Sequence, residues 1–181
     1  MEIFPNIVLL IWRHVLISFF VVVHNCAGAL EIKDQLEPVS IVNSVFHHIS
    51  TAKVDSRAIA IANSKNIEFN NCQIYACQGT AFWIMHTVIT IEDCSIYDNK
   101  LGVMVFEKGN LTFRNNKITK NLNGMVIRPL YTLTSFENNE FSDNQEIGKY
   151  YDLKIITPSD DTDLIGSFYN RNQIDIFIAS V

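Results

Sequence analysis

A motif of eight residues recurs four times in the middle of the chain, at intervals of 22 or 23 residues. It occupies residues 67–74, 89–96, 111–118 and 134–141, and apolar side chains alternate with polar ones within each copy. Alternation with a period of two indicates β-strands, whose successive side chains point to opposite faces. A regular repeat of this length is typical of a solenoid, in which no unit can bury its apolar face without its neighbours.

Each unit holds more than one strand. A second short apolar run follows a glycine at residues 81–84, 103–106 and 125–128. Turn-forming Asn, Asp and Gly residues separate the runs, and nothing between them has the periodicity of a helix. A unit of this length therefore predicts two or three short strands, each hydrogen-bonded to its counterpart one coil away.

The consensus of these units is apolar-x-apolar-x-Asn-Asn-x-apolar-x-x-Asn, followed by Gly-apolar-x-apolar. It resembles the right-handed parallel β-helix repeat of the pectate-lyase-like superfamily over about residues 38–144. The resemblance implies an all-β, single-stranded, right-handed parallel β-helix of about six coils, the first at residues 41–61 and the last at residues 165–178.

The resemblance also implies two inward columns of stacked side chains, in which asparagine amides bond one another at each bend. Asparagine suits such bends because it tolerates left-handed backbone geometry and can satisfy the backbone groups of a turn. The columns are Ser44, Cys72, Cys94, Asn116 and Asn139, and Ile49, Cys77, Asn99, Asn121 and Asn144.

Residues 1–29 differ in composition from the rest, which leaves residues 30–181 as the repeat domain. An apolar stretch at residues 15–23 precedes Ala27-Gly28-Ala29, a sequence typical of signal-peptide cleavage. Alternatively, residues 3–23 form a retained membrane anchor, although Arg13 near its centre would cost about 2.5–3.5 kcal/mol. A third alternative is an apolar helix that covers the open end of the first coil. The fold prediction accordingly includes an apolar N-terminal helical segment.

These alternatives decide the location. A cleaved signal gives a secreted chain, and an anchor places it on the extracellular face of the plasma membrane. Asn110 begins the only N-glycosylation sequon, just after the turn at Lys108-Gly109. The chain ends in an apolar strand at residues 176–181, which predicts a truncated array or a piece of a longer one.

Charge and cysteine spacing narrow the possible partners. The net charge of −5 and the scattered basic residues argue against a nucleic-acid interface.

Cys72 and Cys94 occupy equivalent positions in adjacent coils, about 5 Å apart and within disulfide range. They form either a disulfide or two buried thiols that fill a ladder position. No residues have metal-ligand spacing, so neither a metal nor a cofactor is predicted.

The catalytic sets that the resemblance would imply are missing. The polygalacturonase combination of Asn-Thr-Asp, Gly-His-Gly and Arg-Ile-Lys is absent, and Arg128-Pro129 lacks the Arg-x-Pro-x-x-Arg spacing of pectate lyases. No catalytic residue is predicted. One charged column remains, formed by Glu92, Arg114 and Glu137. It could place two carboxylates beside a base, as a uronic-acid lyase would need, or form an exposed row of ion pairs.

An apolar patch is the main functional signal. Counting from each glycine, the alternation predicts that these residues point outward: Phe82, Ile84, Met104, Phe106 and Val126. A contiguous apolar patch indicates a partner, a covering segment or a platform on which sugar rings stack.

The sequence therefore favours a non-catalytic extracellular module that acts in adhesion, scaffolding or protein–protein interaction. The alternative is a carbohydrate-active or carbohydrate-binding protein that acts on acidic polysaccharide, so enzymatic activity stays open. The expected partner is a protein or polysaccharide at the cell surface, and membrane contact is expected only through residues 3–23 if they are retained.

Overall fold

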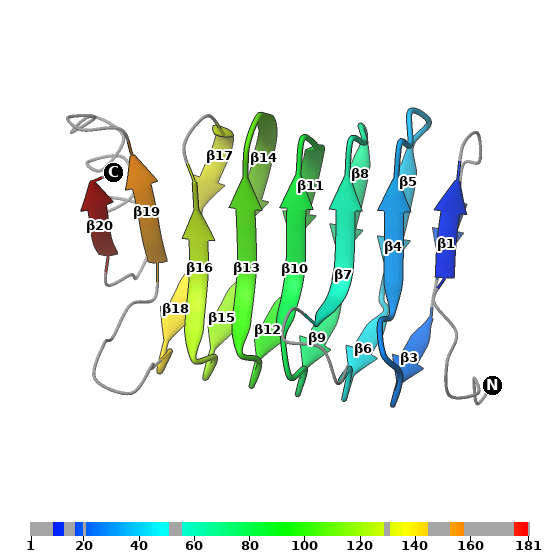
Figure 1. The fold of residues 1–181 in the computed structure, drawn as a ribbon, viewed down its shortest axis with the longest axis horizontal. Helices are drawn as coiled ribbons and strands as arrows, with labels where there is room; N and C mark the ends of the chain where they lie inside the picture. Colours follow the sequence, from blue (N-terminus) through cyan, green and yellow to red (C-terminus); the bar gives the residue numbers. More distant parts are fainter. Residues whose placement is uncertain are drawn as a thin grey trace.

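The computed structural model describes residues 9–12, 17–19, 21–50, 56–128, 131–144, 153–157 and 176–180, with side chains for residues 21–50, 56–128 and 131–144. Every regular element in these ranges is a β-strand, and the strands form three parallel sheets that wrap around one axis (Figure 1). The predicted parallel β-solenoid is therefore confirmed.

The largest sheet has eight strands and carries the site described below. In spatial order it consists of β1 (Leu9–Trp12), β4 (Leu30–Lys33), β7 (Arg57–Ala62), β10 (Thr80–Met85), β13 (Leu101–Phe106), β16 (Asn123–Ile127), β19 (Leu153–Thr157) and β20 (Ile176–Ser180).

The other two sheets have six strands each. One consists of β2 (Ile17–Phe19), β5 (Val39–Val42), β8 (Ile67–Asn70), β11 (Val88–Glu92), β14 (Gly109–Arg114) and β17 (Tyr131–Glu137). The other consists of β3 (Val22–His24), β6 (Val45–His47), β9 (Gln73–Tyr75), β12 (Ser95–Tyr97), β15 (Lys117–Thr119) and β18 (Glu140–Ser142).

The predicted N-terminal helix is wrong for the described residues. β1, β2 and β3 are strands that pair in parallel with β4, β5 and β6, so a coil precedes the first one predicted from the sequence. Extended backbone lets this segment bond to the next coil, as each later coil does. Within the described ranges, no helix is long and apolar enough to cross a membrane. Most of the predicted last coil, residues 165–175, lies outside the described residues.

The turns between the strands use left-handed backbone. Asn71, Asp93, Asn115 and Asn138 have φ between 51° and 56°, and each precedes an inward ladder residue. Asparagine and aspartate adopt this conformation at low cost, because their short side chains can bond to the local backbone. This explains the repeated Asn-Asn pairs: the first residue makes the bend and the second fills the ladder.

Both predicted ladders are present. Asn116 shows the pattern, since its Oδ1 accepts from the Cys94 backbone N–H (2.9 Å) and its Nδ2 donates to the Ile91 carbonyl (2.9 Å) and to Asn139 Oδ1 (3.2 Å). Asn99 and Asn121 repeat these bonds in the other column. Each amide thus satisfies backbone groups that the bend would otherwise leave buried and unbonded.

The outward face on β10 differs from the prediction by one residue. Phe82 and Ile84 are fully buried, and Trp83 takes the outward position. Phe82 pairs with Val103, which places Ala81 beside Gly102 at a position where side chains are very small. A Cβ at Gly102 would collide with the Gly124 carbonyl oxygen. The sequence prediction instead aligned Phe82 with Met104, one residue out of register, and this alignment displaced the alternation.

The rest of the predicted patch does lie on the outer face. Met104 and Phe106 are half-buried there, and Val126 is buried beside Met104. Trp83 and Met85 replace Phe82 and Ile84 as the outward apolar residues of β10. The apolar face therefore survives the correction with a different membership.

Asn116→Ala tests the ladder. The substitution leaves the Cys94 N–H and the Ile91 carbonyl buried without their partner, so we expect a loss of about 3 kcal/mol in the free energy of unfolding. Urea unfolding measures this loss. The control is Asn115→Gly, at an exposed position with φ of 54° that glycine tolerates, and it should change stability by less than about 1 kcal/mol. Equal losses in the two variants would contradict the assignment.

Candidate functional site

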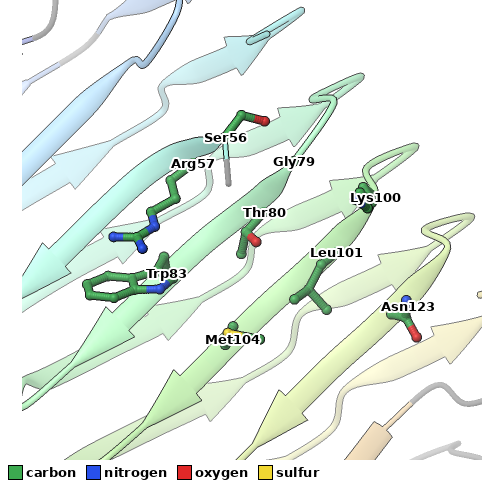
Figure 2. Close-up of a pocket in the computed structure, with 9 residues that line it drawn as sticks. All are labelled: Ser56, Arg57, Gly79, Thr80, Trp83, Lys100, Leu101, Met104 and Asn123. Atoms are coloured by element: carbon green, nitrogen blue, oxygen red, sulfur yellow. The ribbon is translucent and has the colours of Figure 1, made fainter. Parts of the chain in front are cut away.

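The outer face of the eight-stranded sheet holds a hollow of about 220 Å³. Parallel in-register pairing places outward residues of adjacent strands side by side, so two rows of side chains form its walls. Its lining comes from four successive strands and the turns before them: Ser56, Arg57, Gly79, Thr80, Trp83, Lys100, Leu101, Met104 and Asn123 (Figure 2).

The indole of Trp83 lies at one end of the hollow. The Arg57 guanidinium carbon lies 3.8 Å from the centroid of the indole, in a cation–π contact that Figure 2 shows from the side. The ring of Phe106 meets the indole edge-to-face, with centroids 4.6 Å apart. The indole is thus held in place by a cation and a second ring, and it remains only partly exposed.

The hollow combines an apolar surface with positive charge. Trp83, Leu101 and Met104 supply the apolar part, and Arg57 and Lys100 supply two cations. None of the described residues that line the hollow carries a carboxylate. Among the described residues, neither cation forms an ion pair. In a chain of net charge −5, this is a local positive region suited to an anionic group beside an apolar one.

Small residues make room for the hollow. A Cβ at Gly79 would collide with the backbone and side-chain oxygens of Ser56. Ser56 and Gly79, which directly precede β7 and β10, therefore lie very close together at this end of the sheet. Sequence reasoning missed Arg57 and Lys100, because both lie in turns or at strand starts, where the repeat alignment was least regular.

The predicted charged column forms, and its contacts are those of a structural ion pair. Arg114 Nη2 lies 3.0 Å from Glu92 Oε2, and Asn115 Nδ2 donates to Glu92 Oε1 at 3.4 Å. Glu137 is the register partner of Arg114 on β17, and its Oε1 accepts from Ser135 Oγ at 2.9 Å. Arg114 is ion-paired and 39% exposed. The column is therefore better described as a surface ion pair, which contributes about 1 kcal/mol at most, than as a site that holds a catalytic base.

The cysteines are free thiols, so the disulfide weighed for Cys72 and Cys94 is absent. Cys72 donates its backbone N–H to Cys94 Sγ (3.4 Å), as Cys94 in turn donates to Asn116. The sulfur atoms thus continue the asparagine ladder. Burial raises the pKa of the Cys77 thiol to about 11, which keeps it protonated and unreactive at neutral pH.

The remaining predicted residue, Asn110, is exposed at the start of β14. Its backbone N–H donates to the Thr87 carbonyl at 3.0 Å. Among the described residues, no group of three or more His, Cys, Asp or Glu side chains is placed to hold a metal ion.

Comparison with known proteins gives one match. A family model described as a right handed beta helix region matches residues 21–154, which is most of the chain. No curated protein and no solved structure matches it. Functional inference therefore depends on the residues of this chain.

Proposed function

Because the chain belongs to the right-handed β-helix family, whose scaffold carries many functions, we propose a role for it from its surface: it is a non-catalytic module that acts outside the cell in adhesion or scaffolding. It works by binding, and its contact surface is the outer face of the eight-stranded sheet. The observation that carries this proposal is the hollow beside Trp83, with its apolar lining and two cations free of ion pairs among the described residues.

The composition of this face supports a protein partner. Interface centres are enriched in Trp, Met, Phe and Arg, and Trp83, Met104, Phe106 and Arg57 bring these four types together. Trp83 and Phe106 hold each other in place, so little side-chain entropy is lost when a partner covers them. The face is therefore preorganised for a contact that buries apolar surface.

A second copy of the chain is the partner that the charges favour. The net charge of −5 means that acidic groups exceed basic ones over the molecule as a whole, whereas the described lining of this hollow presents Arg57 and Lys100 and no carboxylate. Another copy could therefore place an acidic surface against this face. Contact between copies on opposing surfaces is also the simplest form of adhesion.

Self-association tests this proposal. We expect sedimentation velocity to show a concentration-dependent dimer for the unaltered chain, and the double variant Trp83→Ser/Met104→Ser to weaken it by about thirtyfold or more, the effect of losing about 2 kcal/mol from an interface centre. The control is Leu36→Ser, which removes an apolar side chain that is 59% exposed outside the hollow. A chain that stays monomeric at every concentration, or a double variant that dimerises normally, contradicts the proposal.

The same hollow supports a second candidate function, binding of acidic polysaccharide. Arg57 and Lys100 could pair with uronate carboxylates, while Trp83, Thr80 and Asn123 offer an indole and polar groups to a sugar. This candidate needs at least part of the indole surface to accept a sugar ring, although Arg57 already covers one of its faces.

Affinity electrophoresis in gels containing polygalacturonate tests this candidate. Binding would retard the chain, and Arg57→Ala/Lys100→Ala should abolish the retardation, whereas the control Lys117→Ala/Lys120→Ala should keep it, because those lysines lie outside the hollow. Absorbance of unsaturated uronate in the same samples would reveal turnover, and its loss in Arg114→Ala would favour a lyase. No retardation and no turnover would rule this candidate out.

Location is tested by the intact mass of chain recovered from secreting eukaryotic cells after deglycosylation. A start at Leu30 in the medium, with a glycan on Asn110, is the expected result for a module secreted through a cleaved signal. Such a chain would lack β1, β2 and β3, and its solenoid would begin at β4. Met1 in the membrane fraction would instead make residues 3–23 an anchor on the outer face of the plasma membrane. Met1 in a soluble cytosolic form would contradict the extracellular role.

A further inference from the structure

A column of aromatic rings crosses the outer face of the third sheet. His24, His47, Tyr75 and Tyr97 come from β3, β6, β9 and β12, and each lies beside the next in register. Their ring centroids are 5.1, 4.9 and 4.8 Å apart, and their planes differ by 14°, 7° and 4°. The rings therefore stack face to face along the axis and link four successive coils.

The first two coils meet at the histidine end of this column. His48 lies beside His47, and the two Nδ1 atoms are 2.7 Å apart, so one must carry the proton and the other must accept it. His47 therefore contacts two other imidazoles, His24 by stacking and His48 by a hydrogen bond that exists only while at least one ring is neutral.

The described groups that face His47 carry no negative charge that would stabilise a protonated imidazole. The strands packed on β6 present His24 from β3 and Tyr75 from β9, and the neighbouring turns present Asn25 and Ala76. Asp98 lies further along, in the turn after Tyr97. Burial, followed by the charges of His48 and His24, lowers the pKa of His47. Since this pKa lies below that of an unfolded histidine, the stability that the neutral ring provides is present above pH 6.5 and is lost as the pH falls through the folded-state pKa.

We propose that this histidine cluster is an acid-sensitive joint, which holds the first coil on the second at neutral pH and loosens in mild acid. Protonation breaks the His47–His48 hydrogen bond and places like charges in stacked rings about 5 Å apart. Repulsion at this distance weakens pairing by about fourfold for each charged pair in a water-like dielectric. The two contacts of His47 together predict a loss of roughly tenfold or more.

Hydrogen exchange of the full chain at about pH 7.5 and about pH 5.0 tests the joint, with rates corrected for intrinsic exchange. We expect residues 22–26 and 45–49 to lose roughly tenfold protection in acid, while residues 95–99 in β12 and its turn keep theirs. His47→Tyr should abolish this loss, because a tyrosine continues the stack on Tyr75 but does not titrate between these pH values.

Two further variants separate the joint from general acid unfolding. His48→Asn removes the second imidazole at a position with φ of 54°, which asparagine tolerates, and should reduce the acid effect even if His47→Tyr folds poorly. His86→Gln should leave the effect unchanged, since His86 pairs with Glu107 (2.7 Å) outside the cluster. Unchanged protection of residues 22–26 in acid, or the same loss in His47→Tyr and His48→Asn as in the unaltered chain, would overturn the proposal. The histidine stack needs residues 21–29, so the sample must be one whose mass shows that they are present.

Discussion

The fold depends on how each coil satisfies the backbone groups that its bends bury. A strand that turns inward around a narrow core leaves N–H and C=O groups with no water to bond, and an unbonded group of this kind costs about 1–3 kcal/mol. The Asn116 and Asn121 amides remove this cost by bonding one coil forward and one coil back. The bonds form only if every coil places its bend at the same height, so the ladder fixes both the length of the repeat and the register of the strands.

In-register stacking also determines what the surface can do. Residues that are 22 or 23 positions apart become neighbours, so each outward position becomes a row along the axis. The Glu92–Arg114 pair, the His24–His47 stack and the Lys117–Glu140 pair are three results of this geometry. Such rows suit extended contacts with a partner. Catalysis more often needs groups that converge on one atom from several directions, and the described surface shows no such set.

Features that recur in every coil could be predicted from the sequence, whereas predictions were wrong where a coil departs from the regular spacing. The solenoid and the Glu92–Arg114 pairing follow from the spacing of the repeat, and both ladders follow from the family resemblance. The outward face of β10 was misassigned because Ala81 occupies the position of Gly102 and not that of Val103, and a shift of one residue reverses which side chains are buried. Cys26 was missed as the head of the second ladder, because its apolar surroundings resemble a signal segment as much as a strand.

The hollow and the histidine stack show why function was harder to predict than fold. Both arise where a coil departs from the consensus: Gly79 and Ser56 leave space beside Trp83, and histidines replace tyrosine at the first two positions of the ring column. A consensus identifies what every coil shares, which is the set of residues that holds the solenoid together. Residues that differ between coils are not needed for that task, so they are the ones on which binding or a response to pH can depend. The hollow and the stack also lie on different sheets, and a change in one need not disturb the other.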